Sequence, residues 1–143
     1  MIPKNSVSVL LLEEEAIIAL DVEFSLSQAG YTIAAVFSTG GKALEWLSDH
    51  SPSVVILDVQ LKDGPSHRVA RTLSERAIPF IVHSSICRPG ADAFAAGTWV
   101  LKPCCPTELA KAIARSLHLA DHPELHPGSL PEAVSASSRQ MHR

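Results

Sequence analysis

The chain has 143 residues, of which 46% are hydrophobic and 19% are charged, enough for one sizeable core but too few for two comfortable domains. Its formal net charge is −3 and its pI is near 6.1. Because surfaces that bind nucleic acid usually carry an excess of Lys and Arg, direct binding to nucleic acid is disfavoured.

Two local features favour a cytoplasmic protein. The first apolar run, residues 7–12, is too short for a signal peptide or a membrane span and is followed by three glutamates. Cys87, Cys104 and Cys105 fit neither a disulfide framework nor a metal-binding cysteine pair. We interpret the adjacent Cys104 and Cys105 as buried or half-buried thiols. A reducing cytosol is therefore the expected location, and no contact with a membrane is expected.

Apolar, β-rich runs alternate with stretches of helical periodicity along the chain. The runs predict strands at residues 7–12, 31–37, 54–57, 79–83 and 98–101. The intervening stretches predict helices at about residues 15–29, around 43–47, at 66–76, briefly around 89–95, and at 106–119. This order is typical of an α/β fold with a doubly wound, five-stranded parallel sheet, in the flavodoxin-like strand order 2-1-3-4-5, with five helices of which the fourth is short.

Several residues mark the faces and ends of the first helix. Ile17, Leu20 and Phe24 recur at helical spacing. Gly30 follows them, and a glycine in this position commonly ends a helix. A helix that begins near Glu15 and ends before Gly30 is therefore expected.

The segment after the third strand predicts a loop and then a helix. Residues 63–65 are expected to form the loop, and Ser66 is placed to cap the helix that follows. Arg68, Arg71 and Arg76 are expected on the solvated face of that helix.

One folded domain is expected over residues 6–119. From residue 120 onward the chain is rich in Pro, Ser and His and has few large apolar side chains. Residues 120–143 are therefore expected to form a tail that is flexible or is ordered by a partner.

Polar side chains follow several of the predicted strands directly. Glu13 and Glu14 follow the first, Asp58 the third, Ser84 the fourth and Lys102 the fifth. Parallel strands end at the same edge of a sheet, so these side chains are expected to converge. Three carboxylates beside an apolar core repel one another unless a cation joins them, and oxygen ligands of this kind suit Mg²⁺.

With Mg²⁺ and Lys102 neutralising an incoming phosphate, Asp58 is placed to attack phosphorus and become an aspartyl phosphate, and Ser84 to hydrogen-bond a phosphate oxygen. The simpler interpretation is that the acids at 13–15 open a helix and that Asp58 caps a loop. Either explanation serves for each residue alone. Their joint placement at strand ends favours a functional cluster.

The same residues lie in strings that resemble the receiver domain of two-component response regulators, over about residues 6–119. The strings are residues 9–15, residues 55–61 with Asp63 and Gly64, residues 79–84, and residues 100–103. Residues 71–80 resemble the small stand-alone receivers of proteobacteria. In this order the strings are specific, although each alone is weak.

The resemblance implies a phosphorylation site that depends on Mg²⁺. Asp58 would take phosphate from a histidine kinase or a histidine phosphotransfer protein. Glu14, Asp58 and the backbone carbonyl of Gln60 would ligate Mg²⁺, and Glu13 would act through water. Glu14 stands where the family usually has the shorter Asp.

The resemblance also implies a switch that reports phosphorylation. Ser84 would be its hydroxyl, Lys102 the counter-ion of the phosphate, and the Lys102–Pro103 peptide bond would be cis. The surface expected to change, and so to signal through protein contacts, includes Trp99, Pro103, Cys104, Cys105 and Leu109. Trp99 replaces the usual Tyr or Phe.

The expected protein is thus a signalling domain and not an enzyme, with an unknown downstream protein partner and the possibility of a homodimer. One alternative is a pseudo-receiver, an interaction module of the same fold that does not use phosphate. A more distant alternative is a small metal-dependent phosphohydrolase with Asp58 as nucleophile. That class needs a second acid where this chain has Gln60.

Overall fold

The computed structural model describes residues 6–85, 92–103 and 106–121. Its strands are β1 (Ser8–Leu12), β2 (Thr32–Phe37), β3 (Val54–Leu57), β4 (Gln60–Leu61), β5 (Gly64–Pro65), β6 (Phe80–Ser84) and β7 (Thr98–Leu101). Its helices are α1 (Ala16–Gln28), α2 (Gly40–Leu47), α3 (His67–Glu75), α4 (Pro106–Asp121) and the 3₁₀ turn η2 (Asp92–Phe94). In the described ranges, none of these helices is both long and apolar enough to cross a membrane.

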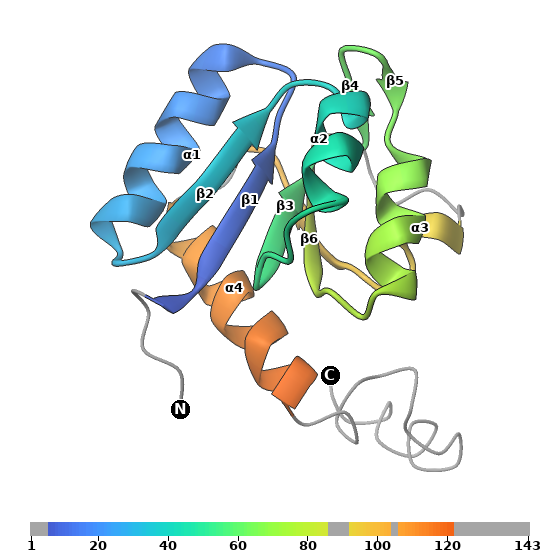
Figure 1. Cartoon of the computed structure of the whole chain (residues 1–143). Coiled ribbons are helices and arrows are strands. Elements are labelled where there is room, and N and C mark those ends of the chain that lie inside the picture. Colours follow the sequence, from blue (N-terminus) through green and yellow to red (C-terminus); the bar gives the residue numbers. More distant parts are fainter. Residues whose placement is uncertain (1–5, 86–91, 104–105, 122–143) are drawn as a thin grey trace, which may run out of the picture.

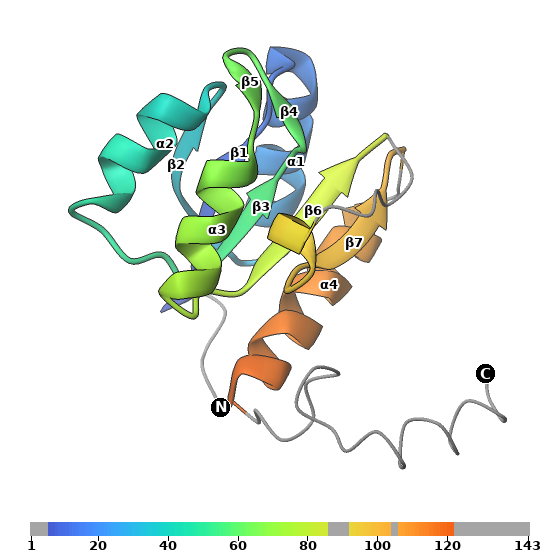
Figure 2. The same cartoon turned by 90° about the vertical axis from the view of Figure 1, so that its right-hand side faces the viewer.

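The main sheet has five parallel strands in the order β2-β1-β3-β6-β7. Figure 1 labels the first four of these strands, and Figure 2 labels β7 beside β6. Strands β4 and β5 belong to a separate small sheet, so this is the predicted order 2-1-3-4-5, and the flavodoxin-like fold is confirmed. The central strand β3 is buried along its whole length. That burial explains its uninterrupted apolar sequence, because helices cover both faces of such a sheet.

Helices pack on both faces of the sheet and enclose two apolar cores (Figure 2). On one face, α2 and α3 cover side chains that include Leu10, Leu57 and Val82. On the other face, α1 and α4 cover the alternate residues of the same strands, among them Leu11 and Ile56. Because successive strand residues point to opposite faces, each continuous apolar run supplies both cores.

The structure corrects the expected loop at residues 63–65. Gly64 and Pro65 form β5, which pairs antiparallel with β4, so a small hairpin directly follows β3. Its strands have only two residues each, too few for any alternation of polar and apolar residues to announce them.

The helix ends follow the predictions with two differences. Gly30 follows α1 with a φ of 100°, the left-handed conformation that ends helices. The expected fourth helix is, in its described part, only the 3₁₀ turn η2, and residues 89–91 lie outside the described ranges. The last helix, α4, reaches Asp121, two residues past its expected end.

Helix α1 is apolar on its outer side as well as on its inner side. Ala19, Val22 and Leu26 are buried against the sheet. Ile17, Leu20 and Phe24 are 81%, 65% and 65% exposed. Helical spacing showed that these three residues share a face, but not that this face points away from the core.

Gly97, just before β7, has no room for a side chain. A Cβ built on it would lie 2.6 Å from Cε2 and 2.8 Å from Cδ2 of Phe80, which is 2% exposed. We expect Gly97→Ala to lower the free energy of unfolding by about 1–3 kcal/mol, the usual cost of overpacking a core. Denaturant unfolding measures the loss.

The double variant Gly97→Ala with Phe80→Leu is the control for that explanation. It removes the ring atoms that the new Cβ meets. The alanine should then cost less than it does in the wild-type background, since the two positions are in contact. Equal costs in both backgrounds would show that the clash is not the cause.

Candidate functional site

The carboxyl edge of the sheet brings together the acids and the lysine that follow its strands. Lys102, just after β7, places its Nζ 2.8 Å from Glu13 Oε1 and 2.8 Å from Asp58 Oδ2. Glu13 is 2% exposed and Asp58 is 7% exposed. One ammonium group therefore joins two buried carboxylates that come from strands β1 and β3.

Burial and ion pairing set the charges in this cluster. Burial raises the pKa of Glu13, and hydrogen bonds from Lys102 and from the Glu15 amide offset only part of that effect. Burial alone would lower the pKa of Lys102, but hydrogen bonds to Asp58 and Glu13 outweigh it, and its pKa is raised. The raised pKa of Glu13 favours the neutral form of that acid, whereas the raised pKa of Lys102 favours the charged form of the lysine. We take Lys102 as charged, because it contacts both acids directly.

A cleft of about 320 Å³ opens over Asp58 and Lys102. Ser84 lines it from the end of β6 and is buried. Glu14 and Gln60 also line it and lie nearer to solvent. The cleft thus gathers every side chain that the sequence placed at the strand ends except Glu13. The buried carboxylate of Glu13 does not line the cleft but contacts Lys102, which does.

The donors at the cleft fit a hydrated Mg²⁺. Within the described ranges, no group of three or more Asp, Glu, His or Cys side chains is arranged to hold a metal ion. Mg²⁺ is, however, usually held by one or two carboxylates together with water. Glu14 and Asp58 line the cleft with Gln60, whereas both carboxylate oxygens of Glu13 already accept hydrogen bonds, from Lys102 and from the Glu15 amide.

Ser66 fixes the backbone at Asp58 and Val59. Its hydroxyl donates to the carbonyl of Asp58 at 2.7 Å and lies 3.1 Å from that of Val59, and its amide donates to Val59 at 2.8 Å. Ser66 is the N-cap residue of α3, as predicted, but its side chain makes no capping bond there. Only the tertiary fold turns this buried hydroxyl toward Asp58.

The residues expected to form the switch surface lie in different surroundings. Trp99 is half-buried and packs edge-on against Phe94 of η2, with ring centroids 6.2 Å apart. The Lys102–Pro103 bond is cis. Leu109 is 3% exposed, so it belongs to the core beneath α1 and not to the surface. Cys104 and Cys105 lie outside the described ranges, as does Cys87.

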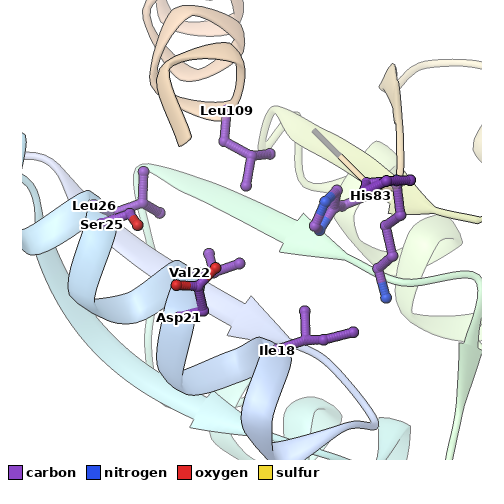
Figure 3. Close-up of a pocket in the computed structure, with 9 residues that line it drawn as sticks. Ile18, Asp21, Val22, Ser25, Leu26, His83 and Leu109 are labelled. Carbon is purple, nitrogen blue, oxygen red and sulfur yellow. The ribbon is translucent and has the colours of Figure 1, made fainter. Parts of the chain in front are cut away.

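A second cavity, of about 160 Å³, lies between α1 and α4. Figure 3 shows His83 directed from β6 toward this space, facing Ile18 and Val22 of α1 and Leu109 of α4. Ile18 and Lys102 line both this cavity and the cleft. A role for His83 could not be predicted from the sequence, because a polar residue inside a predicted strand gives no sign of which face it occupies.

Comparison with known proteins gives relatives of one kind. No family model matches the chain. Its sequence is 30% identical over 112 residues to the transcriptional regulatory protein PdtaR of Mycobacterium tuberculosis, a match that covers 73% of this chain and 54% of the relative. The chain thus spans about half the length of the curated relatives it matches.

Two solved structures cover most of both chains. SdrG from Sphingomonas melonis is 30% identical, with a TM-score of 0.66 and coverage of 78% of this chain and 96% of SdrG. A response regulator receiver protein from Sinorhizobium medicae is 28% identical, with a TM-score of 0.69 and coverage of 80% and 96%. The similarity therefore extends over a whole domain of that kind.

The buried His83 makes stability depend on pH. Burial, with the nearby Lys102, lowers the pKa of His83 to about 4, below its ordinary value of 6.5. Above pH 6.5 both folded and unfolded chains hold it neutral, whereas between 6.5 and about 4 only the unfolded chain binds the proton. We expect about 3 kcal/mol of stability to be lost across that window.

The measurement is denaturant unfolding of the wild type and of His83→Leu at several pH values between 7.5 and 4. The leucine variant keeps an apolar group in the cavity and cannot titrate. Its free energy of unfolding should fall less steeply with acid than that of the wild type. Parallel curves would mean that His83 is not the group responsible.

Proposed function

Because this chain belongs to the receiver-domain family of response regulators, we propose that Asp58 accepts a phosphoryl group from a phosphohistidine on a partner protein, with Mg²⁺ bound beside it. The observation that carries the proposal is the single ammonium of Lys102 between Glu13 and Asp58 at the mouth of a cleft. A cation in that position can also stabilise the negative charge of a phosphoryl group on Asp58.

The transfer would proceed by displacement at phosphorus. A carboxylate oxygen of Asp58 attacks the phosphorus, the bond to the imidazole nitrogen of the donor breaks, and that nitrogen keeps the electron pair. Bound Mg²⁺ would supply charge neutralisation, held by Glu14, Asp58 and the carbonyl of Gln60. Lys102 is close enough to follow the phosphoryl oxygens without leaving the cleft.

Phosphorylation would then change contacts that exist in the unmodified protein. Lys102 would exchange part of its present pairing with Glu13 and Asp58 for the phosphoryl oxygens, and Ser84 would hydrogen-bond one of them. Such contacts favour one of two surface states only if they differ between the states. Trp99, which lies on β7 before Lys102 and packs on Phe94, is the residue through which that difference would reach the surface.

The outer face of α1 is the proposed binding surface for the protein that donates the phosphoryl group. Ile17, Leu20 and Phe24 form a stripe on the helix whose inner side reaches the cleft through Ile18. Large exposed apolar side chains gathered in one place mark interaction sites. We propose that a helix of a histidine kinase or phosphotransfer protein covers this stripe while its histidine faces Asp58, in the cytoplasm.

A phosphorylation-independent pseudo-receiver is the second candidate. It is favoured by Glu14, whose side chain is longer than the usual Asp, and by the expected fourth helix, which in its described part is only the short turn η2. In both candidates the output is a contact with another protein. They differ in whether Asp58 becomes modified.

Incubation with acetyl phosphate and Mg²⁺, followed by intact-mass measurement, separates the two candidates. Wild type should gain one phosphoryl group, because the donor is small and needs no docking surface. Asp58→Asn should gain none, and chelation of Mg²⁺ should suppress labelling of the wild type. An unlabelled wild type at every divalent cation tested would favour the pseudo-receiver.

Transfer from a protein donor tests the α1 stripe. With the histidine kinase that labels wild type fastest in a panel, Leu20→Lys should slow transfer by about 10-fold or more, as for a central interface residue. Labelling by acetyl phosphate should not change. Ser74→Lys is the matched control, since it adds the same charge at an exposed position of α3 on the other face of the sheet. Equal effects of the two variants would rule out docking on α1.

A further inference from the structure

Helix α2 is bound at its beginning by a side chain from the hairpin that follows Asp58. The carboxylate of Asp63 accepts the amide of Gly40 at 2.8 Å and that of Gly41 at 2.9 Å. These hydrogen bonds lower the pKa of Asp63, so it is ionised at neutral pH. An anion in this position also suits the positive end of the helix dipole.

The end of α2 is bound by a residue that lies beyond α3 in the chain. Arg76, which follows α3, donates to the carbonyl of Leu47 at 2.6 Å, to that of His50 at 2.9 Å and to the hydroxyl of Ser51 at 2.7 Å. The expectation that Arg76 is merely solvated is therefore wrong. An acid at one end and a base at the other fix α2 to the hairpin and to α3.

The hairpin that contains Asp63 also carries atoms of the proposed phosphorylation site. Gln60, its first residue, lies with its amide 3.4 Å from Asp58 Oδ1. Ser66 ties the start of the hairpin to its end through the carbonyls of Asp58 and Val59. At the tip, the amide of Lys62 donates to Ser38 at 3.0 Å, beside the contacts of Asp63.

We propose that Asp63 is a positioning residue for phosphorylation: by holding the hairpin tip on α2, it sets the backbone of Gln60 against the carboxylate of Asp58. This inference rests on the proposed function, since it concerns the metal and phosphoryl chemistry of the same cleft. Asp63 itself does not line the cleft. Its effect would pass through the hairpin backbone.

The chemistry of the contact requires a carboxylate. Two amide donors converge on two acceptor oxygens of Asp63. An asparagine offers one oxygen, and its NH₂ group would meet the second amide donor to donor. Asp63→Asn therefore removes one bond and opposes the other while keeping the size of the side chain.

The experiment compares Asp63→Asn with Arg76→Gln. Arg76 binds the same helix at its far end, so its variant reproduces a loosened α2 without touching the hairpin tip. Mg²⁺ affinity is measured by calorimetric titration, and the rate of labelling by acetyl phosphate is measured as a function of Mg²⁺ concentration. Melting temperatures report the stability of both variants.

Asp63→Asn should weaken Mg²⁺ binding by roughly 3- to 10-fold, near the low end of the loss seen for outer partners of metal sites. The Mg²⁺ concentration for half-maximal labelling should rise by the same factor, with a smaller change in the rate at saturating Mg²⁺. Arg76→Gln should lower the melting temperature but leave Mg²⁺ affinity within about twofold of wild type.

Two results would overturn the inference while leaving the proposed function intact. One is a wild type that is labelled at Asp58 together with an Asp63→Asn variant of unchanged Mg²⁺ affinity. The other is an equal loss of affinity in Arg76→Gln, which would make the effect one of general stability. A wild type that neither binds Mg²⁺ nor gains a phosphoryl group would instead refute the proposed function itself.

Discussion

The contact of one lysine with two buried acids governs the architecture of this site. Lys102 reaches Glu13 and Asp58 at equal distances of 2.8 Å, from a position that is itself half-buried. Two carboxylates at the edge of an apolar core are costly without a partner, and loss of one partner in a buried pair costs about 3–5 kcal/mol. The ends of β1, β3 and β7 are thereby held in one place, which is the floor of the cleft.

The groups around this contact form two regions, a cavity on one side and a hydrogen-bonded hairpin on the other. On the α1 side, His83 and Leu109 line a cavity that shares Lys102 with the cleft, so a rearrangement of the lysine touches both spaces. On the other side, the hairpin after Asp58 is fixed by Ser66 at its base and Asp63 at its tip. Asp58 therefore lies between a hydrogen-bonded hairpin on one side and a lysine shared by two cavities on the other.

The surfaces that surround the cleft differ in character. Helix α1 offers an apolar stripe and contains no Lys or Arg, and acids such as Asp21 and Glu23 lie on the same helix. Near β7, the half-buried Trp99 packs against Phe94, which is itself buried. Receipt of the phosphoryl group and output of the signal would therefore use separate surfaces.

The sequence alone determined the strand order, the cluster at the sheet edge and the family. Apolar runs with polar ends repeat along the chain, and in a parallel sheet that local pattern is sufficient to bring Asp58 and Lys102 together. The tertiary structure alone decided which side of α1 is covered, because a helix that is apolar on both sides gives no preference. It also decided the roles of Ser66, Asp63 and Arg76. Their hydrogen bonds join residues from seven to 29 positions apart. The local sequence around each of these residues therefore does not reveal its hydrogen-bond partner.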